Sequence, residues 1–420
     1  MAARPAESRA AKRLNCDVAI VGAGPAGLTA AIALACNGAQ AVCAGPPFNP
    51  DPARPDTRTT ALLRGSVQLL KNIGVWRYCL AEAAPLDAIR IIDDTGRLLR
   101  APEVEFRADE LGLEAFGFNV PNQSLVAALR RRGGELANLQ LIETSGADAV
   151  EPDTNAVHVK LAEQTTIEAR LVAGADGRNS ICRRAARINT IGWSYDQSAI
   201  ACNFEHTLPH GNVSSEFHHP AGPFTTVPLP GNASSLVWVE RPAVVERLMG
   251  LSDESFREAL ESRLQGMLGR VIGVGPRAAF PLSGLTAQRF ADSRIALLGE
   301  AAHVIPPIGA QGLNLGFRDA AHLAELVNRA LGRNADPGGD NVLRAYDRVR
   351  RSDVVGRTLA VDLLNRSLLS SFLPIQLARG FGLHLLNALS PLRRYVMRQG
   401  LDAESELPDL MRERASLPAA

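Results

Sequence analysis

The fold is decided by the stretch CDVAIVGAGPAGLTAAIALACNG, residues 16–38. Its first six residues are mostly apolar with three β-branched side chains, which is typical of a strand buried inside a parallel sheet. A Gly-x-Gly-x-x-Gly pattern follows, and an Ala/Leu-rich helix is then expected from about Leu28 to Asn37. Gly38 is expected to end that helix before a second strand over residues 40–44. This order of strand, glycine turn, helix and strand indicates an α/β fold.

The three glycines of the pattern have separate physical roles. Gly22 permits the tight turn, Gly24 lets the backbone approach a pyrophosphate, and Gly27 lets the helix pack closely on the strand. The helix N-terminus presents free N–H groups and the positive end of its dipole to the phosphates. This context predicts a dinucleotide site rather than a merely tight strand–helix turn.

One element of this fingerprint is missing. The second strand usually ends with an acidic residue that binds the ribose hydroxyls. Here residues 41–44 run into Gly45, and no Asp or Glu follows the strand before Asp51. Either the backbone and water hold a ribose, or Asp51 or Asp56 reaches back to it.

Length, composition and charge exclude several classes of protein. The 420 residues suggest two or three domains, and 46% hydrophobic with 21% charged residues is ordinary globular usage. A net charge of +1 argues against a dedicated nucleic-acid binder. The six cysteines contain no CxxC pair, which favours reduced thiols in a cytosolic protein and predicts no metal site. Residues 18–48 carry no charge, but glycines and prolines interrupt them, so we expect a buried α/β unit and not a membrane span.

The rest of the chain divides into segments whose sequence patterns predict different secondary structure. A helical stretch is expected over 59–82, antiparallel strands over 88–106, a helix over 122–132, and strands over 139–148 and 156–173. Strand-like runs separated by Pro and Gly over 190–285, with one amphipathic helix at about 253–268, predict a separate antiparallel sheet. Gly273-Val274-Gly275 is interpreted as a turn. A buried strand returns at 294–299, a helix starts at about Leu313, and residues 340–400 are expected to be helical.

Two further segments select a family. AGADGRNS at 173–180 resembles the Asp-Gly motif of flavin-dependent aromatic hydroxylases, while GEAAH at 299–303 and PIGAQGLN at 307–314 resemble their Gly-Asp motif and Pro-x-x-Gly-Gln-Gly loop. All three landmarks follow the order and spacing of that family over about residues 15–400. The chain is most similar to the ubiquinone-biosynthesis hydroxylases, on DTRTTAL at 56–62 and on the 344–401 tail, especially LLNRS at 363–367.

The resemblance implies a fold and a division into domains. The expected fold is α/β: a Rossmann-like FAD-binding domain of residues 15–189 and 286–338, an inserted antiparallel β-sheet substrate-binding domain of residues 190–285, and a C-terminal helical region of residues 339–420. Residues 1–14 are expected to be a mobile tail, and residues 85–118 to contribute to the substrate side.

The resemblance also implies an activity. An FAD-dependent monooxygenase would use NAD(P)H and O₂ to hydroxylate the aromatic ring of a polyprenylated phenol in ubiquinone biosynthesis, through a flavin C4a-hydroperoxide. The flavin carries out the oxygen chemistry, while the protein binds, orients and excludes water, so no nucleophile triad is expected. No second dinucleotide domain is visible, so NAD(P)H is expected to bind transiently as a co-substrate.

Roles at the site follow from the same resemblance. Glu300 would accept a hydrogen bond from a ribitol hydroxyl, and Pro307 would lie beside the isoalloxazine. The N–H groups near Gly312 and Leu313 would stabilise negative charge at the flavin N1/O2 edge, which makes Pro307, Gly312 and Leu313 the expected catalytic group. The implied FAD contacts are Gly22, Ala23, Gly24, Pro25, Ala26, Gly27, Arg58, Asn122, Asp176, Gly299, Glu300, Pro307, Ala310, Gln311, Gly312, Leu313 and Asn314.

Each of these assignments has an ordinary structural alternative. Arg58 could be a surface arginine at a helix start, Asn122 a helix N-cap, and Asp176 a cap of the Gly177 turn. His303 is interpreted as a structural hydrogen-bonding residue, not a base, and the other histidines, including His218 and His219, are expected on the surface or in loops.

Two residues depart from the family pattern, and both bear on function. Glu300 replaces an Asp, and Ala310 replaces the first glycine of Gly-Gln-Gly, which requires a negative φ at Ala310. With the missing ribose acid they motivate a third hypothesis, a non-catalytic scaffold subunit of a ubiquinone-biosynthesis complex, beside the monooxygenase and a flavin-dependent isoprenoid reductase. Residues 361–401 mix apolar runs with Arg379, Arg393, Arg394 and Arg398, so they either cover the core or contact the inner membrane peripherally from the bacterial cytoplasm. The expected partners are a lipophilic prenylated phenol, O₂, such a complex and this membrane surface, with no nucleic acid.

Overall fold

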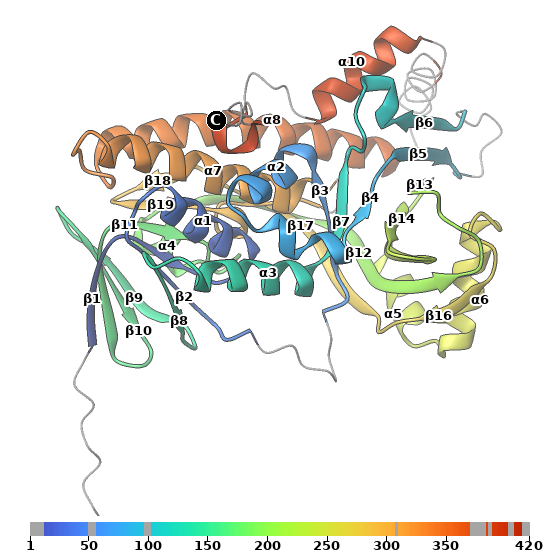
Figure 1. Ribbon diagram of the computed structural model, residues 1–420. Helices are drawn as coiled ribbons and strands as arrows, with labels where there is room; N and C mark the ends of the chain where they lie inside the picture. Colours follow the sequence, from blue (N-terminus) through green and yellow to red (C-terminus); the bar gives the residue numbers. More distant parts are fainter. Residues whose placement is uncertain are drawn as a thin grey trace, which may run out of the picture.

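Two large sheets lie side by side along the molecule, and helices cover them (Figure 1). The computed structural model describes residues 12–48, 56–95, 102–306, 310–369, 384, 389–401 and 407–413. All six cysteines, which lie within these ranges, are unpaired thiols.

Eight strands form the first sheet: β1 (Lys12–Val21), β2 (Ala41–Gly45), β8 (Leu139–Glu143), β9 (Ala147–Pro152), β10 (Val157–Leu161), β11 (Thr165–Gly174), β18 (Ala291–Asp292) and β19 (Ile295–Leu297). Its centre is parallel, in the order β19-β11-β1-β2-β8. The carboxyl ends of these strands therefore meet at one edge, where ligands bind in open α/β sheets. β1 starts within the segment predicted as a tail, because its first residues pair with the start of β11.

One helix explains the uncharged window of the sequence. α1 (Pro25–Cys36) has a proline in its first turn, and every residue from Gly27 to Ala35 is buried. It packs between α3 (Asn122–Gly134) and α7 (Gln311–Leu331). A helix that is apolar all round must be covered on all sides, and this one is. Gly38 follows its C-terminus with a φ of +92°, as predicted.

Nine strands form the second sheet: β5 (Ala88–Asp93), β6 (Val104–Arg107), β12 (Thr190–His206), β13 (Val213–His219), β14 (Gly222–Leu229), β15 (Ala233–Glu240), β16 (Val271–Val274), β17 (Ala278–Ala287) and β20 (His303–Val304). One face packs its Ile200, Cys202, Phe204 and Trp238 against the side of α5 (Pro242–Met249) and α6 (Asp253–Leu264). Strand alternation turns Ala199 and its neighbours to the opposite face, toward the first sheet.

The helix predicted over 59–82 is wrong at both ends. Residues 59–63 form β3 (Thr59–Leu63), which pairs with β7 (Gly117–Pro121) in a small sheet completed by β4 (Ala84–Pro85). Two adjacent threonines favour a strand, and pairing with β7 provides the partner. Only α2 (Arg64–Asn72) is α-helical, because Gly74 ends it with a φ of +77°, and the short helices η1 (Trp76–Tyr78) and η2 (Leu80–Glu82) follow.

Two other local interpretations are corrected by pairing along the second sheet. Residues Gly273 and Val274 lie in β16, which pairs with β12, so the expected turn begins only after them. His218 and His219 lie in β13 and are buried, whereas surface or loop positions were expected. Polar neighbours accommodate them: His218 contacts Glu216 at 2.7 Å, and Arg263 donates a hydrogen bond to Nδ1 of His219 at 2.9 Å.

His219 is expected to make the fold less stable in acid. Burial, followed by the positive charge of Arg263, lowers the pKa of His219 to about 4, and Asp94 opposes this shift only in part. Because the folded pKa lies below the unfolded value of about 6.5, the contribution is complete above pH 6.5 and is lost as the pH falls toward 4. The free energy of unfolding should fall by up to about 1.4 kcal/mol per pH unit in this window. Urea unfolding between pH 7 and 4.5 should show that the free energy of unfolding depends less steeply on pH in His219→Gln than in the wild type. An unchanged pH dependence would contradict the assignment.

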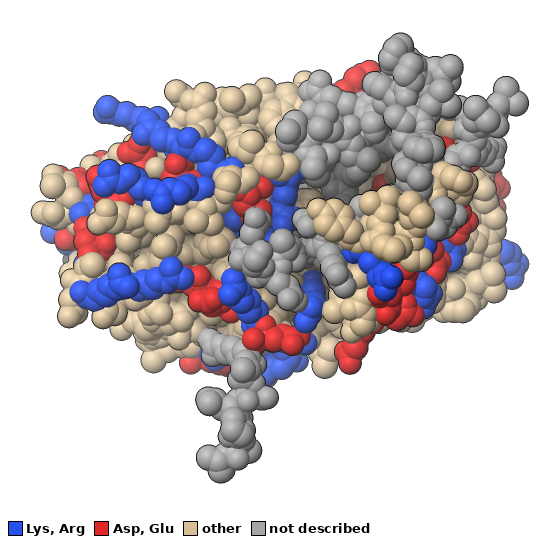
Figure 2. All heavy atoms as spheres, turned by 90° about the horizontal axis from the view of Figure 1, so that it is seen from above, with Lys and Arg blue, Asp and Glu red and all other residues tan. Residues whose placement is uncertain are grey.

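The remaining elements connect and cover the two sheets. α8 (Asp340–Leu369) packs on α7, and α10 (Ser390–Leu401) lies near η3 (Ala108–Leu111), where Arg393 pairs with Glu110 at 2.6 Å. No helix in the described ranges is long and apolar enough to cross a bilayer. On the upper face of the molecule as drawn in Figure 1, basic and acidic side chains lie next to each other (Figure 2). The short elements are α4 (Ile181–Ala185), η4 (Gly299–Ala301) and η6 (Asp409–Met411).

Candidate active site

The glycine turn after β1 has the shape that a pyrophosphate needs. A Cβ on Gly22, whose φ is +112°, would lie 2.2 Å from the carbonyl oxygen of Ala175, and a Cβ on Gly27 would lie 1.9 Å from that of Gly22. Only glycine fits these two positions. A Cβ on Gly24, by contrast, would have no described atom within 4 Å, so this backbone opens toward free space in front of α1. The tight turn predicted at Gly22 and the close packing predicted at Gly27 are confirmed, and the role of Gly24 stays a prediction.

A second turn, after β11, lies against the first. Ala175 donates a hydrogen bond from its N–H to the carbonyl of Val21 at 2.8 Å, which places Asp176 beside the glycine turn. The Oδ2 atom of Asp176 accepts a hydrogen bond from the N–H of Cys182 at 3.1 Å. Its Oδ1 atom is buried and has no partner among the described residues. An orphaned acceptor at this place fits a hydroxyl or amide donor of a bound nucleotide.

A third turn, after β19, is tied to the second by a residue that sequence reasoning missed. Arg183 donates from Nη1 to the carbonyl of Ala301 at 2.7 Å and from Nη2 to that of Arg178 at 2.6 Å. Its planar guanidinium thus joins the Asp-Gly and Gly-Glu turns. The only sequence signal was an arginine just after the Asp-Gly motif.

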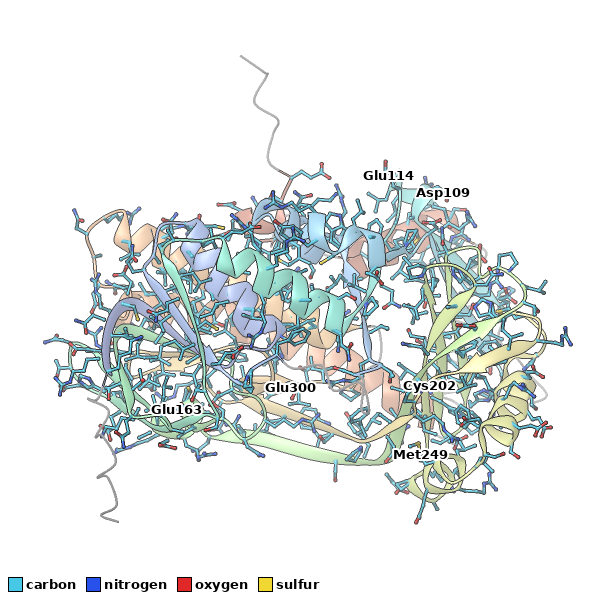
Figure 3. All side chains as sticks on the ribbon, turned by 60° about the horizontal axis from the view of Figure 1, so that its bottom comes forward. Asp109, Glu114, Glu163, Cys202, Met249 and Glu300 are labelled. Carbon is cyan, nitrogen blue, oxygen red and sulfur yellow. The ribbon has the colours of Figure 1, made fainter. Side chains whose placement is uncertain are left out.

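Glu300 lies in the middle of the molecule, between the two sheets (Figure 3). Its side chain is 62% exposed, and its Oε2 atom is 3.6 Å from Nε of Arg178. Arg58 lies on the same side and forms two hydrogen bonds of 2.7 Å with Asp56. Burial alone would raise the pKa of Asp56, but Arg58 and Asn122 together lower it below its ordinary value, so Asp56 stays ionised and committed to Arg58.

Asn122 and Arg58 are positioned by the small sheet and not by a helix cap. Pro121 is the N-cap of α3 and Asn122 is its first residue, so the N-cap alternative for Asn122 is wrong. The N–H of Asn122 donates to the carbonyl of Arg58 at 3.0 Å, and its Oδ1 atom accepts from Thr60 at 2.6 Å. Arg58 precedes a strand, so the helix-start alternative does not apply either.

A cavity of about 280 Å³ joins these groups to the second sheet. Charged and polar groups form its rim on the side of the first sheet, whereas small or apolar residues of the second sheet form its floor. The floor could accommodate an aromatic ring, and the rim includes Arg178 and Glu300 from the turns after β11 and β19. Its lining includes Arg58, Asn122, Arg178, Ala201, Phe280 and Glu300.

The loop that leads to α7 contains a strained residue. Ala310 has a φ of +54°, so the expected negative φ is wrong. The side chain of Asn314 holds this conformation, because its Nδ2 atom donates to the carbonyls of Ala310 at 2.6 Å and Ala61 at 2.9 Å. Its Oδ1 atom accepts from Leu63 N–H and Ser66 hydroxyl, so the amide of Asn314 is fully used within the protein.

The catalytic group expected around this loop is described in part. Gly312 and Leu313 form the first turn of α7, where N–H groups lack partners within the helix. A Cβ on Gly312 would meet no described atom within 4 Å, which leaves its backbone approachable. Pro307 lies outside the described residues.

Replacing the strained residue is expected to stabilise the protein. An L-residue in the left-handed region costs about 1–2 kcal/mol, and glycine removes this strain. Glycine also gives the unfolded chain more conformational freedom, which offsets part of the gain. Ala310→Gly should therefore raise the free energy of unfolding by roughly 0.5–1 kcal/mol in urea titrations. Ala302→Gly is the control, because Ala302, at the end of η4, has a φ of −100° and its replacement should destabilise. A loss of stability in Ala310→Gly would contradict the strain.

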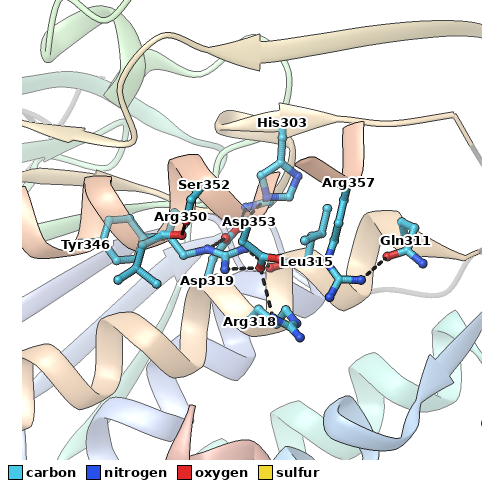
Figure 4. Close-up of polar contacts among 12 residues, drawn as sticks. His303, Gln311, Leu315, Arg318, Asp319, Tyr346, Arg350, Ser352, Asp353 and Arg357 are labelled. Atoms are coloured by element: carbon cyan, nitrogen blue, oxygen red, sulfur yellow. Dashed lines mark hydrogen bonds and ion pairs between the residues drawn. The ribbon is translucent and has the colours of Figure 1, made fainter. Parts of the chain in front are cut away.

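A buried ion network fixes both ends of this loop (Figure 4). The Oδ2 atom of Asp319 accepts hydrogen bonds from the N–H of Gly299 and from Nε2 of His303, both at 2.8 Å. Its Oδ1 atom accepts from Nε of Arg350 on α8 at 2.6 Å. Asp319 and Arg350 are fully buried. His303 therefore acts as a hydrogen-bonding residue of the network, as interpreted from the sequence.

The far end of the loop is held by the same pair of helices. Arg357 of α8 bonds Asp353 at 2.8 Å and donates to Oε1 of Gln311 at 3.3 Å. Burial alone would raise the pKa of Asp353, but Arg350, Arg318 and Arg357 lower it strongly. Gly299 and Gln311 are thus both tied to α8 through ionised groups.

The residues present fit FAD at this site. The open backbone at Gly24, the orphaned oxygen of Asp176 and the exposed carboxylate of Glu300 lie along three adjoining turns, and the cavity begins at Glu300. Such an arrangement of turns, sheet floor and covering helices defines a flavin-dependent aromatic hydroxylase. Known proteins agree: a model of the FAD binding domain matches residues 15–359.

The chain belongs to this FAD-binding family, among the hydroxylases of ubiquinone biosynthesis, and it is an FAD-dependent monooxygenase. Ubiquinone hydroxylase UbiL of Rhodospirillum rubrum is 37% identical and covers 94% of this chain and 92% of its own length. The 3-demethoxyubiquinol 3-hydroxylase of Escherichia coli is 29% identical over 92% of this chain and 98% of its own length. The crystal structure of p-nitrophenol 4-monooxygenase PnpA from Pseudomonas putida shares the fold, with a TM-score of 0.75 at 18% identity over 94% of this chain and 99% of that chain.

Proposed function

We propose that the protein hydroxylates the aromatic ring of a lipophilic prenylated phenol in ubiquinone biosynthesis, with O₂ and NAD(P)H as co-substrates. The cavity between the two sheets carries this proposal, because it offers an apolar floor to a ring and a charged rim to the cofactor. Similar proteins are named for ubiquinone hydroxylation, which supports the choice of substrate. We include β5 and β6 in the substrate side, since β5 pairs with β13 of the second sheet.

The chain's own residues have separate tasks in this proposal. The turn at Gly24 receives the pyrophosphate, and Glu300 accepts a hydrogen bond from the ribitol chain. N–H groups of Gly312 and Leu313 at the start of α7 stabilise negative charge that develops on the bound ring system. Arg183 keeps the two neighbouring turns in register. Bound FAD, reduced by the nicotinamide cofactor, supplies the activation of O₂.

Incorporation of oxygen from labelled dioxygen tests this function. Purified protein, FAD, NADPH or NADH and a prenylated phenol should give a product that carries one labelled oxygen atom. A product reduced at an isoprenoid double bond, without label, would instead support a reductase. A protein that shows no flavin absorption after FAD has been added and the unbound excess removed would support the scaffold subunit.

We also propose a peripheral membrane contact through α10. Leu392 and Tyr395 of α10 and Leu389 just before it are exposed, beside the exposed Arg394, which suits an interface between apolar chains and anionic headgroups. Co-sedimentation with anionic vesicles should weaken in Leu392→Glu. Leu208→Glu, at an exposed leucine of the segment between β12 and β13, should bind as the wild type does, and equal binding of all three proteins would contradict the contact.

A further inference from the structure

The tip of β2 has no room for the usual ribose acid. β2 ends at Gly45, about 20 residues after the glycine turn, where that acid is ordinarily found. A Cβ on Gly45 would lie 2.4 Å from the backbone nitrogen and 2.7 Å from the Cβ of Ala23. Since Ala23 belongs to the glycine turn itself, any side chain at Gly45 would displace the phosphate-binding backbone.

Of the two acids suggested by the sequence, the one that the structure describes is already engaged elsewhere. Asp56 is held by two hydrogen bonds to Arg58 on the cavity side of the site. Asp51 lies outside the described residues. Among the described residues, a carboxylate at this edge of the sheet comes from another element.

The neighbouring strand provides one. β8 runs parallel to β2, and its last residue, Glu143, is in register with Gly45. Neighbouring strands lie about 4.8 Å apart, so Glu143 ends one strand further along the same carboxyl edge. Its side chain is 60% exposed, so its carboxylate is accessible to a ligand.

Arg130 of α3 orients this carboxylate. Its Nη1 atom donates to Oε1 of Glu143 at 3.0 Å, and its Nη2 atom donates to the carbonyl of Pro46 at 2.7 Å. The guanidinium of Arg130 lies 5.8 Å from the ring centre of Phe48, and the side chain of Arg130 is only 18% exposed. Arg130 therefore joins the segment after β2 to the tip of β8. The hydrogen bonds described for Glu143 use Oε1, which leaves Oε2 for a hydroxyl group.

We propose that Glu143, oriented by Arg130, binds the ribose hydroxyls of the adenosine half of FAD, in place of an acid that the tip of β2 cannot carry. A carboxylate accepts hydrogen bonds from a ribose diol and repels a phosphate on the same ribose. The assignment rests on the proposed FAD site, and it adds the residues that recognise the nucleotide end.

Equilibrium binding of FAD and ADP tests this assignment with the full-length apoprotein. Glu143→Gln is expected to weaken the binding of both ligands by the same factor, about 10-fold, because it removes the charged acceptor that contacts the adenosine half shared by FAD and ADP. The preference for ADP over 2′-phospho-ADP should also fall in this variant, a change that a structural defect would not produce. Arg130→Met should also lower the affinity for ADP.

Glu151→Gln is the matched control, because Glu151 also forms an exposed ion pair on the same sheet, with Lys160 of β10 at 2.6 Å. It should bind FAD and ADP as the wild type does. Unchanged ADP binding and unchanged discrimination in Glu143→Gln, with a wild type that binds FAD, would overturn the assignment. A wild type that binds neither ligand would instead overturn the proposed FAD site as a whole.

Discussion

The Gly24→Asp protein is expected to fold and to purify without flavin. Gly24 is the N-cap of α1 with a φ of −76° and a ψ of 177°, a conformation that aspartate adopts readily at this helix position. No described atom lies within 4 Å of the added Cβ, so the fold has room for the side chain. Its carboxylate would occupy the space of the pyrophosphate and repel its charges. At about 4 Å and an effective dielectric constant of 20 this repulsion is about 4 kcal/mol, or a loss of roughly 1,000-fold in FAD affinity.

Two companion variants separate charge, size and folding in this experiment. Gly24→Asn has nearly the same volume without the charge, so it should keep the loss of affinity due to the clash and recover the part due to charge repulsion. Gly27→Ala places a Cβ 1.9 Å from a backbone oxygen, so it should lower the yield of folded protein itself. The ratio of flavin to protein absorbance, fluorescence titration with FAD and thermal unfolding distinguish these outcomes. A yellow Gly24→Asp protein with wild-type stability would show that the phosphates lie elsewhere.

The glycine turn could be predicted because a short sequence pattern records it. Gly27 is required by the carbonyl of Gly22, five residues earlier, and Gly22 adopts the positive φ of the tight turn itself. The contact of Gly22 with Ala175 on the adjoining strand adds to this requirement but was not needed to predict it. The all-apolar character of α1 likewise predicted that it would be covered on every side. The family resemblance extended this reasoning to Asp176 and Glu300, which lie on turns next to the glycine turn.

The failures concern features that depend on partners far away in the chain. The strand at Thr59–Leu63 exists because β7 pairs with it, and β7 lies more than fifty residues later. The positive φ of Ala310 is held by Asn314, whose amide is in turn engaged by the segment that contains Ala61, Leu63 and Ser66. No periodicity or propensity records such contacts, so an alanine in this position could only be interpreted by its intrinsic preference.

The bond between Arg350 and Asp319 could not be predicted for the same reason, and its removal is expected to have a large effect. Arg350→Met should destabilise the protein by about 3–5 kcal/mol, because it leaves Asp319 fully buried without its guanidinium partner. Flavin affinity should fall as well, since Asp319 holds the N–H of Gly299 at the start of the flavin loop. Arg351→Met is the control on the same helix: Arg351 is 47% exposed and pairs with Asp347, so its loss should cost less than about 1 kcal/mol.

The pH dependence and a double variant identify the charge of Asp319 as the cause. In the wild type, burial would raise the pKa of Asp319, but His303, Arg350 and the Gly299 hydrogen bond lower it below its ordinary value. Its contribution is therefore complete at neutral pH and is lost only as the pH falls through that lowered value. Without Arg350, one of the groups that oppose the effect of burial is lost, so the pKa of Asp319 should rise, and the deficit of Arg350→Met should shrink as the pH is lowered and Asp319 takes up a proton. Arg350→Met combined with Asp319→Asn should be less destabilised than the sum of the two single variants, because no uncompensated charge remains. A deficit that is independent of pH and additive with Asp319→Asn would mean that Arg350 acts by packing alone.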